Sequence, residues 1–437
     1  MGSYEAVKVR LDPTPRQERL MASHAGAARF AYNAGLAHVK EALENGEPAD
    51  WSHYSLRRWW NANKDTLAVN PDTGVVWWSR NSKEAYSMAF RDLARGFSNW
   101  SQSRKGQRKG KQVGFPKFKS KNTTMRFAYS ADFTAPKASD PYGLKLPRIG
   151  RVHCMENVHE RVNGARLIRI SVSRRAGHWY ASLTVEREST APESAPKLGA
   201  VGVDLGVKHL ATLSDGTVIP NPRALGTRLK ELRKAQQSLS RKVEGSARRE
   251  RAKERVARLH ARVADVRADA MNKATTMIAE TYSVVCIEDL NVAGMVKNRS
   301  LARSVSDAAL GGFRRQLEYK TARSGAALCV VDRWYRSSKT CSGCGSVKAK
   351  LSLSERTYRC DSCGLAMDRD LNAAINIEVA GSAPETLNAH GATVRRSDRS
   401  SGRRTRVAVK CEPSVRRPGA VSLGAGLGNE AIQPRIN

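Results

Sequence analysis

The sequence predicts a multidomain protein in which helices and strands are mixed along the chain. Its 437 residues suggest two or more domains, and 40% of them are apolar, which is enough to build real cores. Short apolar runs typical of strands stand beside long stretches with helical spacing. Four paired cysteines between residues 341 and 363 add a small metal-binding module to this α+β plan.

The first hundred residues predict one strand followed by helices. Residues 4–11 alternate apolar and polar side chains, as a short strand does, and residues 16–40 are alanine-rich with helical spacing. A further helix is expected after an N-cap signature at Asn81. Its apolar face carries Phe90, Leu93, Phe97 and Trp100. The five tryptophans between residues 51 and 78 suit either stacking on bases or a helical core, and we favour the core.

A basic segment and a strand-rich region come next. Residues 103–121 interleave Lys and Arg with Phe115 and Phe118, which suits a nucleic-acid backbone somewhat better than a solvated linker. Residues 125–188 indicate a small β domain. Its expected strands are 144–146, 167–172 and 178–185. The Pro/Ala/Ser stretch at 191–196 indicates a linker.

The second half of the chain alternates strands with long helices. Residues 201–218 predict a hairpin of two strands that turns at Ser214, Asp215 and Gly216. A basic helical region spans 225–280 with a break at Gly245, and its cations are either solvated or bind a nucleic-acid backbone.

The elements around the remaining motifs are shorter. A buried strand ends at Glu288, and a polar loop over 291–306 is a candidate lid. Later elements are a helix at 313–322, a strand at 326–331 and a helix from Leu371. Residues after 381 are rich in Ser, Arg, Gly and Pro and are expected to be disordered.

Charge and cysteine usage narrow the functional classes. Lys and Arg number 75 against 41 Asp and Glu, so the net charge of +34 favours a polyanion partner over a merely solubilising surface. No segment approaches the roughly 18 apolar residues of a membrane span, and no secretory signal opens the chain. We therefore expect no membrane partner, a cytoplasmic location and a reducing compartment. The cysteines outside the paired spacing are Cys154, Cys286, Cys329 and Cys411.

Three acidic residues each stand at the edge of an apolar run. Asp204 and Glu288 end buried-strand patterns, and Asp370 precedes an apolar helical run. Carboxylates from separate segments suit Mg²⁺, and two such ions can hydrolyse a phosphodiester. The neighbouring acids Asp289, Asp368 and Asp215 are interpreted as capping or turn residues. Among them, Asp368 is the strongest competitor for the role of metal ligand.

The four cysteines follow zinc-ribbon spacing. The pattern is Cys341-x2-Cys344-x15-Cys360-x2-Cys363, with a glycine after the second cysteine of each pair. Four thiolates close a tetrahedral coordination sphere, so the predicted zinc is structural and not catalytic.

Taken together, these motifs resemble the TnpB (OrfB) family of transposon-encoded RNA-guided endonucleases, which is related to the type V CRISPR effectors. The strongest matches are Gly202-Val-Asp204-Leu-Gly-Val-Lys, Ile287-Glu288-Asp-Leu-Asn, Ser337-Ser-Lys-Thr-Cys341-Ser-x-Cys344-Gly and Asp368-Arg-Asp370-Leu-Asn-Ala-Ala-Ile-Asn-Ile. Weaker matches are Leu11-Asp-Pro-Thr-Pro-Arg-Gln and Phe115-Pro-Lys-Phe118-Lys-Ser. The resemblance covers roughly residues 4–380. Arg336 is a departure, because family members often carry proline there.

The resemblance implies a specific domain plan. An N-terminal wedge-like β domain is interrupted by a helical recognition domain, and an RNase H-like (RuvC-type) α/β nuclease domain follows with a zinc ribbon inserted in it. The expected bounds are 1–12 and 116–196 for the wedge, 13–115 for the helical domain, 197–334 and 366–380 for the nuclease, 335–365 for the ribbon and 381–437 for a disordered basic tail.

The resemblance also implies an activity. Asp204, Glu288 and Asp370 would hold two Mg²⁺ ions in an RNA-guided DNA endonuclease, with one structural Zn²⁺, a guide RNA and a double-stranded DNA target. Bound to DNA, the protein would be associated with the nucleoid. Alternatives are a transposase or integrase on the same fold, a non-cleaving guided repressor, and a compact CRISPR effector. No helix-turn-helix or tandem-finger module for reading bases is expected.

Overall fold

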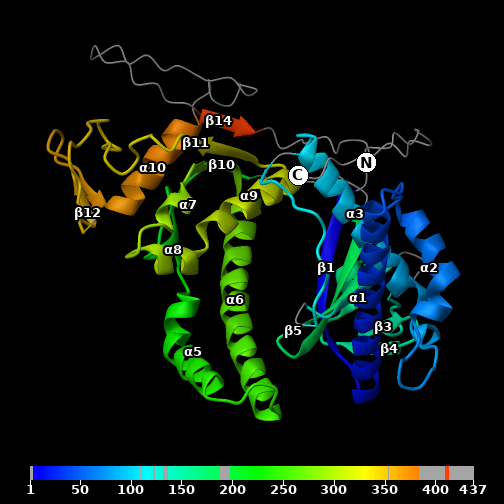
Figure 1. Ribbon diagram of the computed structural model, residues 1–437. Coiled ribbons are helices and arrows are strands. Elements are labelled where there is room, and N and C mark those ends of the chain that lie inside the picture. Colours follow the sequence, from blue (N-terminus) through cyan, green and yellow to red (C-terminus); the bar gives the residue numbers. More distant parts are fainter. Residues whose placement is uncertain are drawn as a thin grey trace. The chain divides into compact units, whose positions relative to one another are not determined.

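The computed structural model describes residues 3–108, 110–121, 124–130, 136–187, 197–352, 354–382 and 409–412 (Figure 1). The chain divides after residue 190 into two compact units. Among the described residues, those up to 187 belong to the first unit and those from 197 on to the second. No helix within these ranges combines the length and apolar character that crossing a bilayer requires.

The first unit contains a six-stranded antiparallel sheet in the order β2-β5-β6-β1-β4-β3. The strands are β1 (Ser3–Asp12), β2 (Arg126–Ser130), β3 (Gly143–Leu146), β4 (Gly150–Cys154), β5 (Arg166–Arg175) and β6 (His178–Arg187). The first strand pairs with the last, from Ser3 opposite Arg187 to Leu11 opposite Trp179. The four expected strands are therefore confirmed, whereas β2 and β4 were not predicted.

Helices pack against this sheet. They are α1 (Pro15–Glu44), α2 (His53–Leu67), the 3-10 helix η1 (Trp78–Arg80), α3 (Lys83–Arg104) and α4 (Val158–Val162). A capping box between Thr14 and Gln17 starts α1. The N-cap of α3 is Ser82, one residue after the expected Asn81, because its hydroxyl accepts a hydrogen bond from the Glu84 amide. Apolar positions of both helices turn inward, as their spacing predicts.

Helices and sheet of the first unit share one hydrophobic core. Trp60 and Phe90 from the helices belong to the same buried cluster as Ile170 and Trp179 from the strands. The prediction that the tryptophan-rich stretch forms a core is confirmed. Helices from the expected helical domain (13–115) and strands from the expected β domain therefore share this core, because α1 and α3 both contact β2 and bury their apolar faces there.

The second unit is built on a six-stranded mixed sheet in the order β14-β11-β10-β7-β8-β9. The strands are β7 (Leu198–Leu205), β8 (His209–Leu213), β9 (Val218–Pro220), β10 (Tyr282–Glu288), β11 (Ala327–Val331) and β14 (Val409–Glu412). Strands β7, β8 and β9 are antiparallel, β10 and β11 run parallel to β7, and β14 is antiparallel to β11. The expected two-strand hairpin over 201–218 is three strands, because a second turn follows Gly206 in addition to the turn expected at Ser214.

Helices join these strands. They are α5 (Ala224–Ser240), α6 (Ala247–Thr281), α7 (Val292–Met295), α8 (Ala302–Ala308), α9 (Leu310–Ser324) and α10 (Arg369–Ser382). Gly245 separates α5 from α6 with a φ of +78°, so the expected break is confirmed. The polar loop expected at 291–306 contains α7 and most of α8 instead, because Val305 is buried in the core of this unit.

Helix α10 lies directly on the sheet. A Cβ atom on Gly202 of β7 would sit 1.9 Å from the Ala374 carbonyl oxygen and 2.5 Å from the Glu378 amide nitrogen. Near the C-terminal end of the helix, a Cβ atom on Gly381 would sit 2.5 Å from the Sγ and 2.7 Å from the Cβ of Cys286 in β10. Glycine is thus required at both contacts, since any side chain would push the helix off the strands.

Helix α10 and β14 correct the expected tail. The helix continues to Ser382, and residues 409–412 form a strand, so disorder does not hold at these positions. The rest of 381–437 lies outside the described residues, as does the expected linker at 191–196.

Replacing Gly202 by alanine should disturb this packing strongly. Because the new methyl group would meet helix backbone and not a flexible side chain, we expect Gly202→Ala to lower the free energy of unfolding by about 3 kcal/mol or more. The matched control is Gly199→Ala in the same strand, where nothing lies within 4 Å and the change should stay within about 0.5 kcal/mol. Thermal unfolding measures both; equal stability of the two variants would contradict close contact of α10 with β7.

Candidate functional site

Two of the predicted acids lie side by side at the ends of neighbouring parallel strands. Val203 of β7 pairs with Ile287 of β10, so the next residue on each strand, Asp204 and Glu288, is at the same level. Both carboxylates are half-buried. Parallel strands end at one edge of a sheet, and this is where their terminal side chains can form a joint site.

The third acid reaches this edge from α10. The close contact between Gly202 and Ala374 fixes the helix over β7. Asp370 precedes Ala374 by four residues, which is one helical turn, and Asp204 follows Gly202 by two residues on the same face of its strand. The charge of Asp370 accordingly acts on Asp204, as do those of Glu288 and, to a smaller extent, Asp368. The structure therefore brings all three predicted acids together.

The electrostatics of this site disfavour three free carboxylates. Burial and the negative charges of Glu288 and Asp370 raise the pKa of Asp204 to about 8, and Arg369 only partly opposes them. Burial also raises the pKa of Glu288, against a hydrogen bond that the Ser337 hydroxyl donates to it. Neighbouring carboxylates raise one another's pKa values, so they do not all ionise unless a cation is bound. Such groups are typical of cation-binding sites.

The donor set suits a hard divalent cation. Carboxylate oxygens are the ligands that Mg²⁺ prefers, and such sites keep water and phosphate oxygens as further ligands. The oxygens of the three acids do not all lie within 4.8 Å of one another in the described part of the chain, where only a group of cysteines meets that limit. The residues thus fit Mg²⁺ by chemistry and leave places for other ligands.

The neighbouring aspartates have other roles. Asp368 is exposed and caps α10, because its Oδ1 accepts hydrogen bonds from the amides of Asp370 at 2.9 Å and Leu371 at 3.2 Å. Asp289 accepts hydrogen bonds from two arginine side chains, and Asp215 accepts one from the Tyr282 hydroxyl. These contacts agree with the interpretation of Asp368 as a capping residue and of Asp215 as a turn residue, whereas Asp289 is instead held in ion pairs with Arg314 and Arg333.

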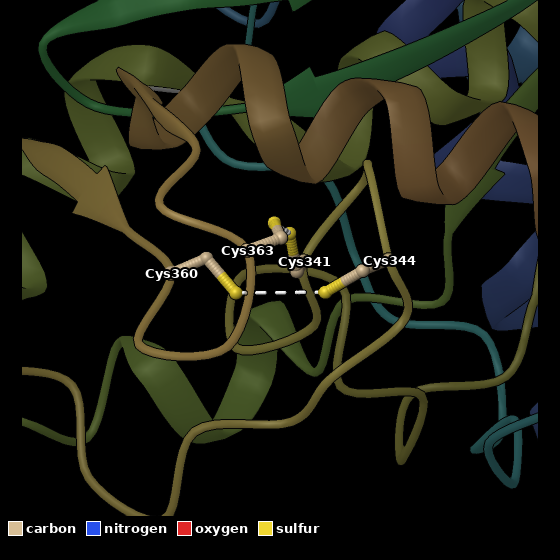
Figure 2. A group of neighbouring side chains, drawn as sticks. All are labelled: Cys341, Cys344, Cys360 and Cys363. Atoms are coloured by element: carbon tan, nitrogen blue, oxygen red, sulfur yellow. Dashed lines mark hydrogen bonds between the residues drawn. The ribbon is translucent and has the colours of Figure 1, made fainter.

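The four paired cysteines converge, as Figure 2 shows. The Sγ atoms of Cys341 and Cys363 are 3.6 Å apart, as are those of Cys344 and Cys360. Tetrahedral zinc with bonds of ~2.3 Å would separate its sulfur ligands by about 3.8 Å. Backbone amides of Cys363 and Ser362 lower the pKa of the Cys360 thiol to about 6, whereas hydrogen bonds with neighbouring cysteines raise the pKa values of Cys344 and Cys363, so the four thiols do not all ionise together without a cation. The expected metal-binding geometry is present.

Both knuckles of the ribbon turn through glycine. Gly345 and Gly364 have φ angles of +76° and +74°, and each donates its amide to the carbonyl of the first cysteine of its pair. The ribbon is completed by a two-stranded sheet of β12 (Thr357–Arg359) and β13 (Ala366–Asp368). Strand β13 ends at Asp368 and α10 begins at Arg369, so the ribbon leads directly into the helical turn that carries Asp370.

Three polar residues near the acids were not predicted. Asn372 and Asn376 are buried in α10 and donate their side-chain amides to the Thr340 carbonyl, each at 2.7 Å. Asn376 also donates to the Ser337 carbonyl at 2.8 Å, and Ser337 in turn bonds Glu288. The helix carrying Asp370 is thus tied to the start of the ribbon. The signal was available: two asparagines four residues apart in an apolar helix need buried partners.

Family comparisons match most of the chain. Residues 182–299 match a family described as a probable transposase (OrfB, IS605), residues 311–377 a Cas12f1-like TNB domain, and residues 1–48 a helix-turn-helix domain. The described residues of the last segment form β1 and the whole of the single uninterrupted helix α1, so no helix-turn-helix is present within 3–48.

The sequence similarity to known proteins extends along nearly the whole chain. A Mycobacterium tuberculosis protein named "Putative RNA-guided DNA endonuclease" is 37% identical, with 91% of each chain covered. An Escherichia coli K12 protein of the same description is 31% identical and covers 88% of this chain and 94% of its own. A solved structure of the mini RNA-guided endonuclease CRISPR-Cas phi3 has a TM-score of 0.41 at 9% identity, covering 87% of this chain and 93% of its own. By its family matches and these relatives, the chain belongs to the TnpB (OrfB) family, which is related to the type V CRISPR effectors.

Proposed function

We propose that this protein is an RNA-guided DNA endonuclease that hydrolyses phosphodiester bonds next to a short flanking motif. The observation that carries the proposal is the meeting of Asp204, Glu288 and Asp370 from three separate segments at one sheet edge. The names of the M. tuberculosis and E. coli relatives support it.

The second unit serves as the nuclease domain. Its three antiparallel strands β7, β8 and β9, followed by the parallel strands β10 and β11, support an RNase H-like, RuvC-type fold. The acids occupy the first strand of this order, the strand parallel to it, and the helix that crosses it. On this basis the nuclease comprises 197–334 and the helix α10, and the ribbon is the insertion between them, extended through β13 three residues beyond the expected 335–365.

Asp204, Glu288 and Asp370 would hold two Mg²⁺ ions. When bound, such ions activate a water molecule and stabilise the leaving oxygen of a phosphodiester. The chain's own part is to place the carboxylates. Ser337 orients Glu288 through its hydroxyl, and the Asp368 cap fixes the first turn of α10. Because its pKa is raised to about 8, Asp204 holds a proton at neutral pH and would release it to solvent when a cation binds.

The ribbon would hold one structural Zn²⁺. All four ligands are cysteines, which leaves no open position for water or substrate. Because Asn372 and Asn376 join the ribbon to α10, the metal would stabilise the helix that carries Asp370.

Nucleic acids are the partners that the charge favours. The net charge of +34 suits a guide RNA and a double-stranded DNA target, and base pairing supplies the sequence specificity in such systems. Helices α5 and α6 display exposed cations: Lys230, Arg233, Lys234, Arg251, Arg255 and Arg258. A protein with these partners would act in the cytoplasm, on the nucleoid when DNA is bound.

A transposase or integrase is the second candidate, because the matched family is described as a probable transposase. Both activities can use three acids and two metals on one fold. Only a guided nuclease depends on RNA for the position of its cuts.

RNA dependence tests the proposed function. We expect the protein with its co-purified RNA and Mg²⁺ to cut a plasmid library at sites that match the guide beside one flanking motif. Protein freed of RNA should bind DNA in a salt-sensitive way without specific cutting, because the protein itself reads only the short flanking motif and the guide reads the rest of the target. Asp204→Ala, Glu288→Ala or Asp370→Ala should each abolish cleavage and leave guided binding within about threefold.

The matched control for the acids is Asp368→Ala, which removes only the helix cap and should retain most cleavage at a cost of ~1 kcal/mol in stability. Loss of activity in Asp368→Ala with full activity in Asp370→Ala would show that the wrong aspartate was chosen. Sequence-specific cutting by RNA-free protein would instead favour the transposase or integrase.

The raised pKa of Asp204 predicts a stability trade-off. The folded state holds this proton more tightly than the unfolded chain, so the contribution of Asp204 to stability falls as pH rises from about 4 to about 8. Asp204→Asn stays neutral and should stabilise the protein in Mg²⁺-free buffer at pH 8 by on the order of 2 kcal/mol, while abolishing cleavage. Adding Mg²⁺ should stabilise the wild type alone. Thermal melts across this pH range check the sign, and a less stable Asn variant would refute it.

Zinc content tests the ribbon. We expect about one zinc per chain by elemental analysis, and its loss in Cys341→Ser or Cys363→Ser, because three ligands bind zinc poorly. Unfolding should then begin at lower temperature. Cys154→Ala, a buried cysteine of the first unit, is the control and should keep the zinc. A zinc-free wild-type protein that cleaves DNA at the full rate would contradict the assignment of a structural zinc to the ribbon.

A further inference from the structure

One tryptophan is exposed where the others are not. Seven of the eight tryptophans are buried or half-buried, whereas Trp334 is 82% exposed. It is the most exposed large apolar side chain in the described ranges. An indole exposed to water contributes little apolar burial to the folded state, and its ring is available to a binding partner.

Trp334 lies on a loop whose two ends both meet Glu288. At one end Val331 of β11 pairs with Glu288 across the sheet, and at the other end Ser337 donates its hydroxyl to the same carboxylate. Trp334 is three residues from each of these contacts. A three-residue span reaches at most about 11 Å, so the Trp334 backbone lies within that distance of both residues that contact Glu288.

This loop is held in place by hydrogen bonds. The Trp334 amide donates to the Asp332 carboxylate at 2.8 Å, and the Tyr335 amide donates to the Asp332 carbonyl at 3.0 Å. Arg333 donates from Nε to the Asp289 carboxylate at 3.0 Å and also contacts it through Nη2. The ring is therefore presented on a fixed turn, at little entropic cost to a ligand.

Two cationic side chains stand on either side of the indole in the sequence. Arg333 and Arg336 flank it in the sequence and are both exposed. Asp289 pairs with both Arg333 and Arg314, and Arg314 also pairs with Glu318, so these pairs hold Arg333 in place beside the indole. An aromatic ring between cations is the arrangement that binds single-stranded nucleic acid, because the ring stacks on a base and the cations meet phosphates.

We propose that Trp334 stacks on an unpaired base of the DNA strand held at Asp204, Glu288 and Asp370, a few nucleotides from the cleaved phosphate. The inference rests on the proposed nuclease function. A duplex hides its base faces, whereas guided unwinding displaces a single strand whose bases are free. Arg333 and Arg336 contact the adjoining phosphates, and the stacked base fixes which phosphate reaches the carboxylates.

Fluorescence tests the contact without any cleavage. In Mg²⁺-free buffer, wild-type protein should have a tryptophan component that acrylamide quenches easily, and a single-stranded oligonucleotide of thymidines should shield it. Trp334→Phe should lack that component while it keeps the same unfolding temperature. Equal shielding in Trp334→Phe would show that another tryptophan is contacted and would overturn the proposal.

Cleavage by the RNA-loaded protein tests the consequence. Trp334→Ala should cut about 5- to 100-fold more slowly, Trp334→Phe should recover most of the rate, and Tyr319→Ala, an exposed aromatic on α9, should match the wild type. One abasic nucleotide near the cut should slow the wild type by a similar factor and leave Trp334→Ala unchanged. Additive losses, or a loss of guide-RNA affinity in Trp334→Ala, would contradict stacking on DNA.

The experiments distinguish the proposed nuclease function from the stacking of Trp334. If the RNA-loaded wild type cuts no DNA, the proposed nuclease function fails, and the fluorescence experiment still decides whether Trp334 binds single strands. If the wild type cuts and Trp334→Ala cuts as fast, only the stacking proposal fails.

Discussion

The close packing of α10 on β7 is the constraint on which the candidate site depends. Two acids share the sheet edge by strand register alone, since Asp204 and Glu288 end neighbouring parallel strands. The third arrives only because Gly202 lets helix backbone touch strand backbone. A methyl group at that position would move Asp370 away from its partners. The chemistry of the site thus rests on the absence of a side chain two residues before the first acid.

The ribbon and the loop before it extend the same arrangement. Buried amides of Asn372 and Asn376 hold the start of the ribbon, and the Ser337 hydroxyl connects that segment to Glu288. A metal held by four cysteines would therefore stiffen the helix that positions Asp370, without entering the reaction. The same loop exposes Trp334, so one short segment would serve both to orient a carboxylate and to receive substrate.

Local patterns predicted much of this, and non-local contacts account for the rest. The strand ends at Asp204 and Glu288 and the cysteine spacing are visible in the sequence, but β1 has no local sign that it pairs with residues 179–187. Helix α8 was expected to be loop because its segment is polar, yet burial of Val305 stabilises it. The sequence left Asp368 competing with Asp370; only the hydrogen bonds to the helix amides show that Asp368 is a cap.

The most direct test is to locate the bound metal. Crystals or particles of the RNA-loaded protein prepared with Mn²⁺ in place of Mg²⁺ allow the ion to be found, in crystals by its anomalous scattering. We expect Mn²⁺ among the carboxylates of Asp204, Glu288 and Asp370, with Asp368 still hydrogen-bonded to the first turn of α10. Mn²⁺ bound by Asp368 in place of Asp370, or absent from this sheet edge at saturating concentration, would contradict the assignment of the site.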